Sequence, residues 1–227
     1  VDKNNLYYSD IDGALYNKSG TKIISYPAGK PGDIVLPDSL EEIGYGAFEN
    51  TIGTKILFNK NGNLNSIGFR AFYGAQNLTE IMIPKTIVEI DYYAFANCQK
   101  LVSFKFEEGT QISIIAEGAF YGCRKLINVE LPDSLNIISE YTFYGCSSLV
   151  SLPALSNDGL INIKEYAFAH TGIESLTLSI SIEEIGNYAF MGSKLKEIII
   201  PKECENIVKL GLGVFEKCND LNRITLP

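Results

Sequence analysis

Residue types that commonly carry catalysis, membrane insertion or nucleic-acid binding are scarce in this chain of 227 residues. It contains no tryptophan, two methionines and a single histidine, His170. No apolar run approaches the roughly 18 residues that a membrane helix requires, and no N-terminal signal segment is present. No run of Lys and Arg exceeds two residues, and the formal net charge is −8. The sequence therefore predicts no binding to nucleic acid, whose phosphates require clustered basic side chains, and no membrane insertion.

The few candidate catalytic side chains lack partners. His170 follows Phe168 by two residues at a turn position, where we expect exposure to solvent, and no nucleophile shares its place in the chain's pattern. Asp10 and Asp12 are spaced as in a turn, without the further acids of a calcium loop. No phosphate-binding glycine loop or metal-ligand cluster is found. We therefore predict no catalytic residue, no cofactor and no metal.

Carbohydrate-cleaving enzymes need two carboxyl groups that face each other across a few ångströms. The nearest candidate pair in this sequence is Glu107 with Glu130. Lys105 is expected beside Glu130, and a surface ion pair explains that neighbourhood more simply. The chain is therefore predicted not to be an enzyme.

What the sequence has in abundance is one repeat of 22 to 25 residues. Its anchor is a phenylalanine, usually preceded by alanine: Phe48, Phe72, Phe95, Phe120, Phe143, Phe168, Phe190 and Phe215. Five residues before each anchor stands an isoleucine or leucine: Ile43, Ile67, Ile90, Ile115, Ile138, Ile163, Ile185 and Leu210. After most anchors comes L-x-x-I-x-I, as in LTEIMIP (78–84), LVSLPAL (149–155) and LKEIIIP (195–201), which predicts a short strand. Since one such repeat cannot bury its own apolar face, neighbours must stack into a solenoid.

The two half-motifs resemble those of the BspA-like bacterial leucine-rich repeat family, I-x-x-I-x-x-x-A-F-x-x-C followed by L-x-x-I-x-I-P. The resemblance covers residues 34–227. It implies a β-rich leucine-rich repeat solenoid, assigned by convention to the α/β class, with about eight repeats and parallel strands. Members of that family are typically secreted or anchored at the bacterial cell surface, and some are adhesins that bind host matrix proteins.

Residues 1–31 do not fit the repeat. They predict two or three short strands with turns at Asp12-Gly13 and near Ser19-Gly20, which form a hairpin cap over the first coil of the 32–227 solenoid in a single domain. Helix content is expected to be small, with residues 182–192 forming at most a turn or short helical piece. The chain starts at Val1 without Met and stops at the end of a strand half-repeat, which suggests a trimmed form of a protein that continues past Pro227.

Four of the five cysteines occupy one slot, three residues after the anchor: Cys98, Cys123, Cys146 and Cys218. In the other repeats the slot holds Thr51, Ala75, Thr171 and Ser193. We interpret it as a position for a small buried side chain, and the cysteines as reduced packing residues. Disulfides between successive coils are within reach but are not needed, because the substitutes cannot form them.

The register of the predicted strands points two columns of side chains outward. This face is where solenoids usually bind a partner. The predicted partner-binding residues are Glu80, Met82, Lys105, Asn128, Glu130, Thr177, Glu197, Ile199, Arg223 and Thr225.

Tyrosines gather around the anchors and predict a strip along one side of the solenoid: Tyr73, Tyr92, Tyr93, Tyr121, Tyr144, Tyr166 and Tyr188, with Tyr45 and Tyr141. One interpretation is a ladder in which the rings pack on neighbouring repeats. The other is a recognition strip for a protein or a sugar.

The sequence thus favours a non-enzymatic, extracellular or cell-surface interaction module that binds a protein ligand such as a host surface or matrix protein. A carbohydrate-binding solenoid, or less readily a carbohydrate-cleaving one, is the alternative from another class. A rigid surface spacer is the third.

Overall fold

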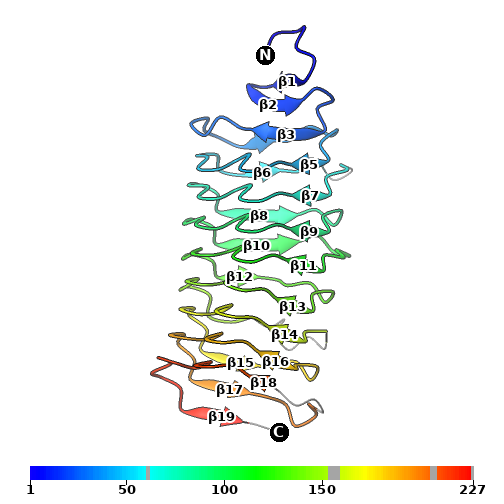
Figure 1. Ribbon diagram of the computed structural model, residues 1–227. Coiled ribbons are helices and arrows are strands. Elements are labelled where there is room, and N and C mark those ends of the chain that lie inside the picture. The colour runs from blue at the N-terminus through cyan, green and yellow to red at the C-terminus, as the bar shows by residue number, and fades with distance from the viewer. Residues whose placement is uncertain (60–61, 153–158, 205–208, 226–227) are drawn as a thin grey trace.

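The computed structural model describes residues 1–59, 62–152, 159–204 and 209–225, apart from the side chain of Asn128. Within these ranges the chain is a β-solenoid without helices, in which each repeat makes one coil. Figure 1 shows the coils stacked in sequence order, with the N-terminal hairpins at one end and β19 at the other. The predicted solenoid class is confirmed.

The first face of the solenoid is built from the I-x-I part of each repeat. Its strands pair parallel and in register, so that Glu80, Ser103 and Asn128 are neighbours across three coils. They form three sheets in the orders β4-β6, β12-β10-β8 and β15-β17-β19. The LVSLPAL segment falls partly on residues 153–158, which lie outside the described part of the chain. The strands are β4 (Ile34–Val35), β6 (Ile56–Leu57), β8 (Glu80–Ile83), β10 (Ser103–Phe106), β12 (Asn128–Val129), β15 (Ser175–Thr177), β17 (Glu197–Ile199) and β19 (Arg223–Thr225).

A second ladder of two-residue strands runs through the Ile column that precedes the anchors. In the 182–192 segment, residues 187–192 form a turn as expected, but Glu184 and Ile185 form a strand that was not predicted and that pairs with the coils on either side. A β-branched residue that repeats at a fixed position suits a parallel ladder better than a helical turn. The strands are β5 (Glu42–Ile43), β7 (Ser66–Ile67), β9 (Glu89–Ile90), β11 (Ile114–Ile115), β13 (Ile137–Ile138), β14 (Asn162–Ile163), β16 (Glu184–Ile185) and β18 (Lys209–Leu210).

The N-terminal segment caps this second ladder. β1 (Tyr8–Ile11), β2 (Ala14–Asn17) and β3 (Lys22–Ser25) pair antiparallel, and β3 then pairs parallel with β5. Asp12 and Gly13 have φ of 50° and 78°, as a tight hairpin turn requires. The hairpin cap is therefore present as expected.

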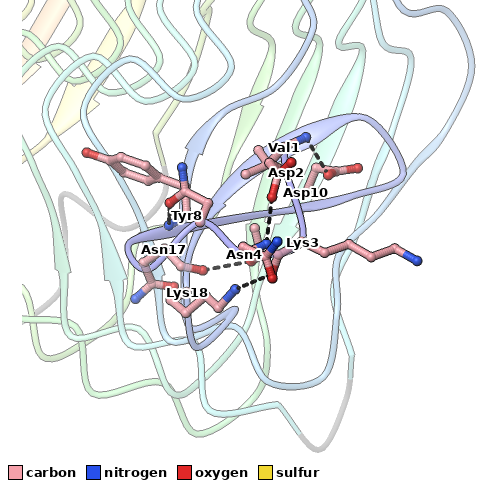
Figure 2. Close-up of polar contacts among 10 residues, drawn as sticks. Val1, Asp2, Lys3, Asn4, Tyr8, Asp10, Asn17 and Lys18 are labelled. Atoms are coloured by element: carbon pink, nitrogen blue, oxygen red, sulfur yellow. Dashed lines mark hydrogen bonds and ion pairs between the residues drawn. The ribbon is translucent and has the colours of Figure 1, made fainter.

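Polar contacts hold the residues before β1 against the hairpin, as Figure 2 shows. The Val1 ammonium lies 2.8 Å from the Asp10 carboxylate, which lowers the pKa of Asp10. The Lys18 ammonium donates to the Lys3 carbonyl at 3.4 Å. Contacts of this kind order the first residues without burying them.

The anchor phenylalanines form one interior column. The rings of Phe48 and Phe72 stack at 4.9 Å, and the stacking continues coil by coil to Phe215. Seven of the eight are fully buried, whereas Phe215 in the last coil is partly buried. At the other end the Tyr26 ring covers Phe48 at 5.3 Å. Each stacked pair adds roughly 0.5–1.5 kcal/mol beyond the burial of its area.

The Ile column is buried with one exception. Leu210, which we expected inside, is 50% exposed. It lies in β18, the end strand of its sheet, and no further described strand covers it. The cap residue Ile23 closes the same column at the first coil and is fully buried. The burial of each repeat thus depends on a neighbour on both sides.

The cysteine slot has a specific hydrogen-bonding role. Each thiol donates to the anchor carbonyl of the preceding coil: Cys98 to Phe72 at 3.1 Å, Cys123 to Phe95 at 3.1 Å, Cys146 to Phe120 at 3.2 Å and Cys218 to Phe190 at 3.0 Å. All five cysteines are free and buried. The slot therefore holds a small buried side chain, and where that side chain is cysteine it also donates a hydrogen bond to the preceding coil.

Candidate interaction surfaces

The predicted columns of the first face point to solvent. Glu80, Met82, Glu130, Thr177 and Arg223 are exposed, and Lys105, Glu197, Ile199 and Thr225 are half-buried. The backbone of Asn128 pairs in β12 with β10. The structure thus gathers these residues on one wall, and their role in binding stays a prediction.

Ion pairs tie neighbouring coils together on this wall. Lys105 pairs with Glu130 at 3.3 Å, as expected from the sequence. Arg223 pairs with Glu197 at 3.1 Å. Lys55 pairs with Glu80 at 2.8 Å, and this hydrogen bond lowers the pKa of Glu80. Such exposed pairs contribute little to stability, but they order the side chains that a partner would meet.

Two apolar members of the wall were missed by the sequence analysis. Val35 is 74% exposed and Leu57 is 44% exposed, and they pair across β4 and β6 next to Met82, which is 52% exposed. The first two repeats lack the leading leucine of L-x-x-I-x-I, so the motif did not identify their strands. The stretch Ile34–Pro37 follows the I-x-I-P ending with leucine in place of the second isoleucine, and it would have revealed the first of the two.

A hollow of about 400 Å³ opens on the wall between β6, β8 and β10. It lies where the strand ladder is interrupted, because β6 and β8 belong to different sheets. Its apolar side chains are flanked by the Lys55–Glu80 pair. The lining includes Lys55, Leu57, Glu80, Met82, Ser103 and Lys105.

A second hollow, of about 580 Å³, contains the carboxyl pair considered for glycoside cleavage. Glu107 accepts a hydrogen bond from the Lys85 amide at 3.2 Å, and Glu130 pairs with Lys105. Each of the two carboxyl groups thus has its own partner at the edge of the hollow.

On another side of the solenoid the tyrosines form a ladder of rings. Tyr121 and Tyr144 stack at 4.9 Å with an interplanar angle of 3°. Tyr141, Tyr166 and Tyr188 stack in a parallel row at 5.1 Å for each pair. The geometry is that of the cross-repeat ladder, and a recognition role for it stays a prediction.

The ladder continues toward the N-terminus with changed geometry. Tyr45 stacks on Phe69 at 5.4 Å, and Tyr93 meets Phe69 and Tyr121 edge-on. The Arg70 guanidinium instead lies over the Tyr73 ring, 3.9 Å from the ring centre. Tyr92 is 48% exposed and has no ring contact within the described ranges.

Several ladder tyrosines sit in an unusual backbone conformation. The residue two before each anchor has a positive φ, and at Tyr93, Tyr141, Tyr166 and Tyr188 the value is 53° to 55°. Glycine fills the same position at Gly46, Gly118 and Gly213. A non-glycine residue in this region costs about 1–3 kcal/mol, whereas a stacked aromatic pair contributes about 0.5–1.5 kcal/mol. Tyr166 stacks on both Tyr141 and Tyr188, so its ring contacts offset a strain of this size.

Carboxylates flank the rings. The Tyr93 hydroxyl donates to Glu117 at 2.5 Å, and burial together with this bond raises the pKa of Tyr93 to about 12. Burial and then the charge of Glu165 raise the pKa of Tyr141. The hydroxyls of Tyr93 and Tyr141 therefore stay neutral beside these carboxylates.

The exposure of His170 differs from the prediction. It is half-buried rather than exposed, because its ring meets Tyr144 edge-on at 5.2 Å. A β-carbon added at Gly192 would lie 2.6 Å from His170 Nδ1, so the imidazole also covers the next coil. The histidine belongs to the aromatic ladder.

The described residues offer no metal site, since no three His, Cys, Asp or Glu side chains among them gather closely enough. The same part of the chain contains no helix with the length and hydropathy that crossing a membrane requires.

Comparison with known proteins gives one family. The family model described as "BspA type Leucine rich repeat region (6 copies)" matches residues 30–150 and 113–227. A search of curated proteins finds no match.

Several crystal structures share the fold. A leucine-rich repeat protein from Bacteroides ovatus is 25% identical with a TM-score of 0.67, over 96% of this chain and 61% of that one. One from Eubacterium ventriosum is 27% identical with a TM-score of 0.75, over 88% of this chain and 53% of that one. A leucine rich cell surface protein from Faecalibacterium prausnitzii, at 17% identity and a TM-score of 0.66, is covered over 78% of its length and covers 99% of this chain. This chain therefore spans little more than half the length of the first two.

Proposed function

This chain belongs to the BspA-type leucine-rich repeat family, and from that premise we propose that it is a non-enzymatic module of a secreted or cell-surface protein that binds a protein partner. The binding surface is the wall formed by β4, β6, β8, β10, β12, β15, β17 and β19, and its main contact region is the hollow beside Leu57 and Met82. The similar protein from Faecalibacterium prausnitzii is a leucine rich cell surface protein, which agrees with this location.

The observation that carries the proposal is the apolar row of Val35, Leu57 and Met82. Large exposed side chains on three successive coils form a contiguous patch, whereas exposed apolar residues on a solvated surface are ordinarily scattered. Ordered ion pairs surround the patch. An apolar centre with a polar rim is the usual composition of a protein–protein interface.

Binding of purified extracellular-matrix proteins and mucins to the immobilised chain tests this proposal. We expect saturable binding of at least one protein, and we expect the double variant Leu57→Asp/Met82→Asp to weaken it about tenfold or more, because two charges then enter the apolar centre. Val88→Asp is the matched control, since Val88 is 57% exposed but precedes β9 on the second ladder.

The same protein preparation also distinguishes a protein partner from the carbohydrate-binding alternative. Binding to one glycan class on an array, with no protein bound, would contradict a protein partner and favour a carbohydrate-binding solenoid. Turnover of a glycan that is lost in Glu130→Gln would establish an enzyme.

A further inference from the structure

The hollow beside Leu57 marks a break in the strand ladder of the wall. Strands of successive coils pair with one another at β4–β6, β8–β10, β10–β12, β15–β17 and β17–β19. β6 and β8 also come from successive coils, yet they belong to different sheets, and the hollow of about 400 Å³ lies between them. Its base reaches the core, since Ile56 and Ile81 line it and are 8% and 4% exposed.

The backbone of β6 directs hydrogen-bonding groups into this hollow. The Ile34 amide donates to the Lys55 carbonyl at 2.8 Å. The Leu36 amide donates to the Leu57 carbonyl at 3.2 Å, so both carbonyls point toward β4. Because peptide groups alternate in direction along a strand, the amide and the carbonyl of Ile56 point toward β8 instead.

The facing edge of β8 has the same property. The Val102 amide donates to the Thr79 carbonyl at 2.7 Å. The Glu107 amide donates to the Ile83 carbonyl at 2.9 Å, so these carbonyls point toward β10. By the same alternation the amide and the carbonyl of Met82 point toward β6. An unpaired strand edge of this kind is a template for main-chain pairing with another chain.

The side chains that flank the gap define which strand it suits. By their place in the repeat, three side chains of β6 and its preceding residue stand opposite three of β8: Lys55 with Glu80, Ile56 with Ile81 and Leu57 with Met82. The first pair is charged and exposed, the second is buried, and the third is apolar and exposed. A strand between them therefore meets a polar position, then a buried apolar one, then an exposed apolar one.

The ion pair at the mouth of the hollow is easily displaced. The Lys55 ammonium reaches across the gap to the Glu80 carboxylate at 2.8 Å, while the two side chains stay 50% and 58% exposed. Exposed pairs of this kind contribute little to stability. A partner can therefore separate them and use both charged groups at its own polar position.

From this geometry we infer that the hollow accepts one extended strand of the protein partner, which pairs its main chain with the facing edges of β6 and β8. The main-chain hydrogen bonds supply affinity, and the order polar, apolar, apolar supplies specificity. A helix in the same place leaves the groups of Ile56 and Met82 unpaired, because its own backbone bonds are internal. The inference rests on the proposed function, since it takes the same hollow, and it adds the conformation of the bound segment.

The test uses a capped, fluorescent peptide that copies residues 79–84 of this chain, Thr-Glu-Ile-Met-Ile-Pro, because it carries the expected order of side chains. Titration with the whole chain is followed by fluorescence anisotropy. We expect saturable binding that Leu57→Asp/Met82→Asp weakens about tenfold or more, since charges then meet the apolar position. Val88→Asp, on the second ladder, should leave peptide binding unchanged.

A second peptide separates main-chain pairing from side-chain contact. The same sequence with both isoleucines N-methylated keeps every side chain but lacks two amide donors, so we expect it to bind about tenfold more weakly or less well still. Hydrogen exchange gives an independent measurement. The amides of Ile56 and Met82 should exchange rapidly in the free chain and at least about tenfold more slowly with the unmodified peptide bound.

Equal binding of the two peptides, or unchanged exchange at both amides in the complex, would overturn the inference. So would the absence of peptide binding. These results leave the proposed function standing, because that proposal fails separately if no matrix protein or mucin binds the chain. Displacement of a bound matrix protein by the unmodified peptide, but not by the N-methylated one, would support both.

Discussion

The Cys146 thiol donates to the backbone carbonyl of Phe120 in the coil before it, at 3.2 Å. That carbonyl also accepts the Cys123 amide at 3.1 Å, so the thiol is its second donor. The contact joins two coils at a site with no room for a larger side chain, since Cys146 is fully buried.

Cys146→Ser should therefore be tolerated and Cys146→Leu should not. A serine hydroxyl can donate to the same carbonyl, and we expect it to change the free energy of unfolding by less than about 1 kcal/mol, whereas leucine overpacks the slot and costs about 1–3 kcal/mol. Urea unfolding followed by circular dichroism measures both. Equal losses in the two variants would refute the role given to this slot.

The buried thiols should not react in the folded chain. Burial raises the pKa of Cys98 and Cys146 well above the ordinary value, so the reactive thiolate is suppressed even in mildly alkaline solution. An aromatic disulfide reagent should release its colour only after unfolding in guanidinium. Rapid reaction of Cys98 or Cys146 under native conditions would show that the slot opens to solvent.

The phenylalanine column should be the largest single source of stability. Phe143 stacks on Phe120 at 5.3 Å and on Phe168 at 5.3 Å, and Phe143→Ala is expected to cost about 3–5 kcal/mol. Phe215→Ala serves as the comparison, because its ring is partly buried and should cost less. Calorimetry that ranks the two variants in the opposite order would refute a continuous interior column.

Much of this architecture could be predicted from the sequence because the anchor phenylalanine recurs at a regular spacing. The Phe anchors, the hairpin at Asp12-Gly13 and the Lys105–Glu130 pair were all predicted, since the register of a parallel ladder fixes what lies beside what. The second strand ladder was not predicted, because two-residue strands carry too short a pattern to be distinguished from turns.

The surfaces were predicted less completely. Val35 and Leu57 were not predicted as part of the wall, because their repeats depart from the motif. His170 was predicted to be exposed, because its position in a turn does not reveal the contact with Tyr144. The positive φ of the ladder tyrosines could not be predicted from residue type, since tyrosine rarely adopts it.

Alkaline pH should weaken the fold through the tyrosine ladder. The folded-state pKa of Tyr93 is about 12, above the ordinary value of 10.0, so folding favours the neutral phenol. Its contribution is fully present below about pH 10 and is lost as the pH rises toward 12. The melting temperature should therefore fall less steeply above pH 10 in Tyr93→Phe than in the parent chain. Identical pH dependence in the two proteins would exclude a stabilising Tyr93–Glu117 contact.

The two methionines report on two different sides of the molecule. Met82 is 52% exposed on the strand wall, and Met191 is half-buried immediately after the Phe190 anchor, on the tyrosine side. Mild peroxide oxidation followed by mass spectrometry, with and without the bound matrix protein, is the most direct test of the central claim. We predict that the partner protects Met82 strongly and Met191 much less. Oxidation of Met82 at the same rate in the complex as in the free chain would contradict a binding surface on the strand wall.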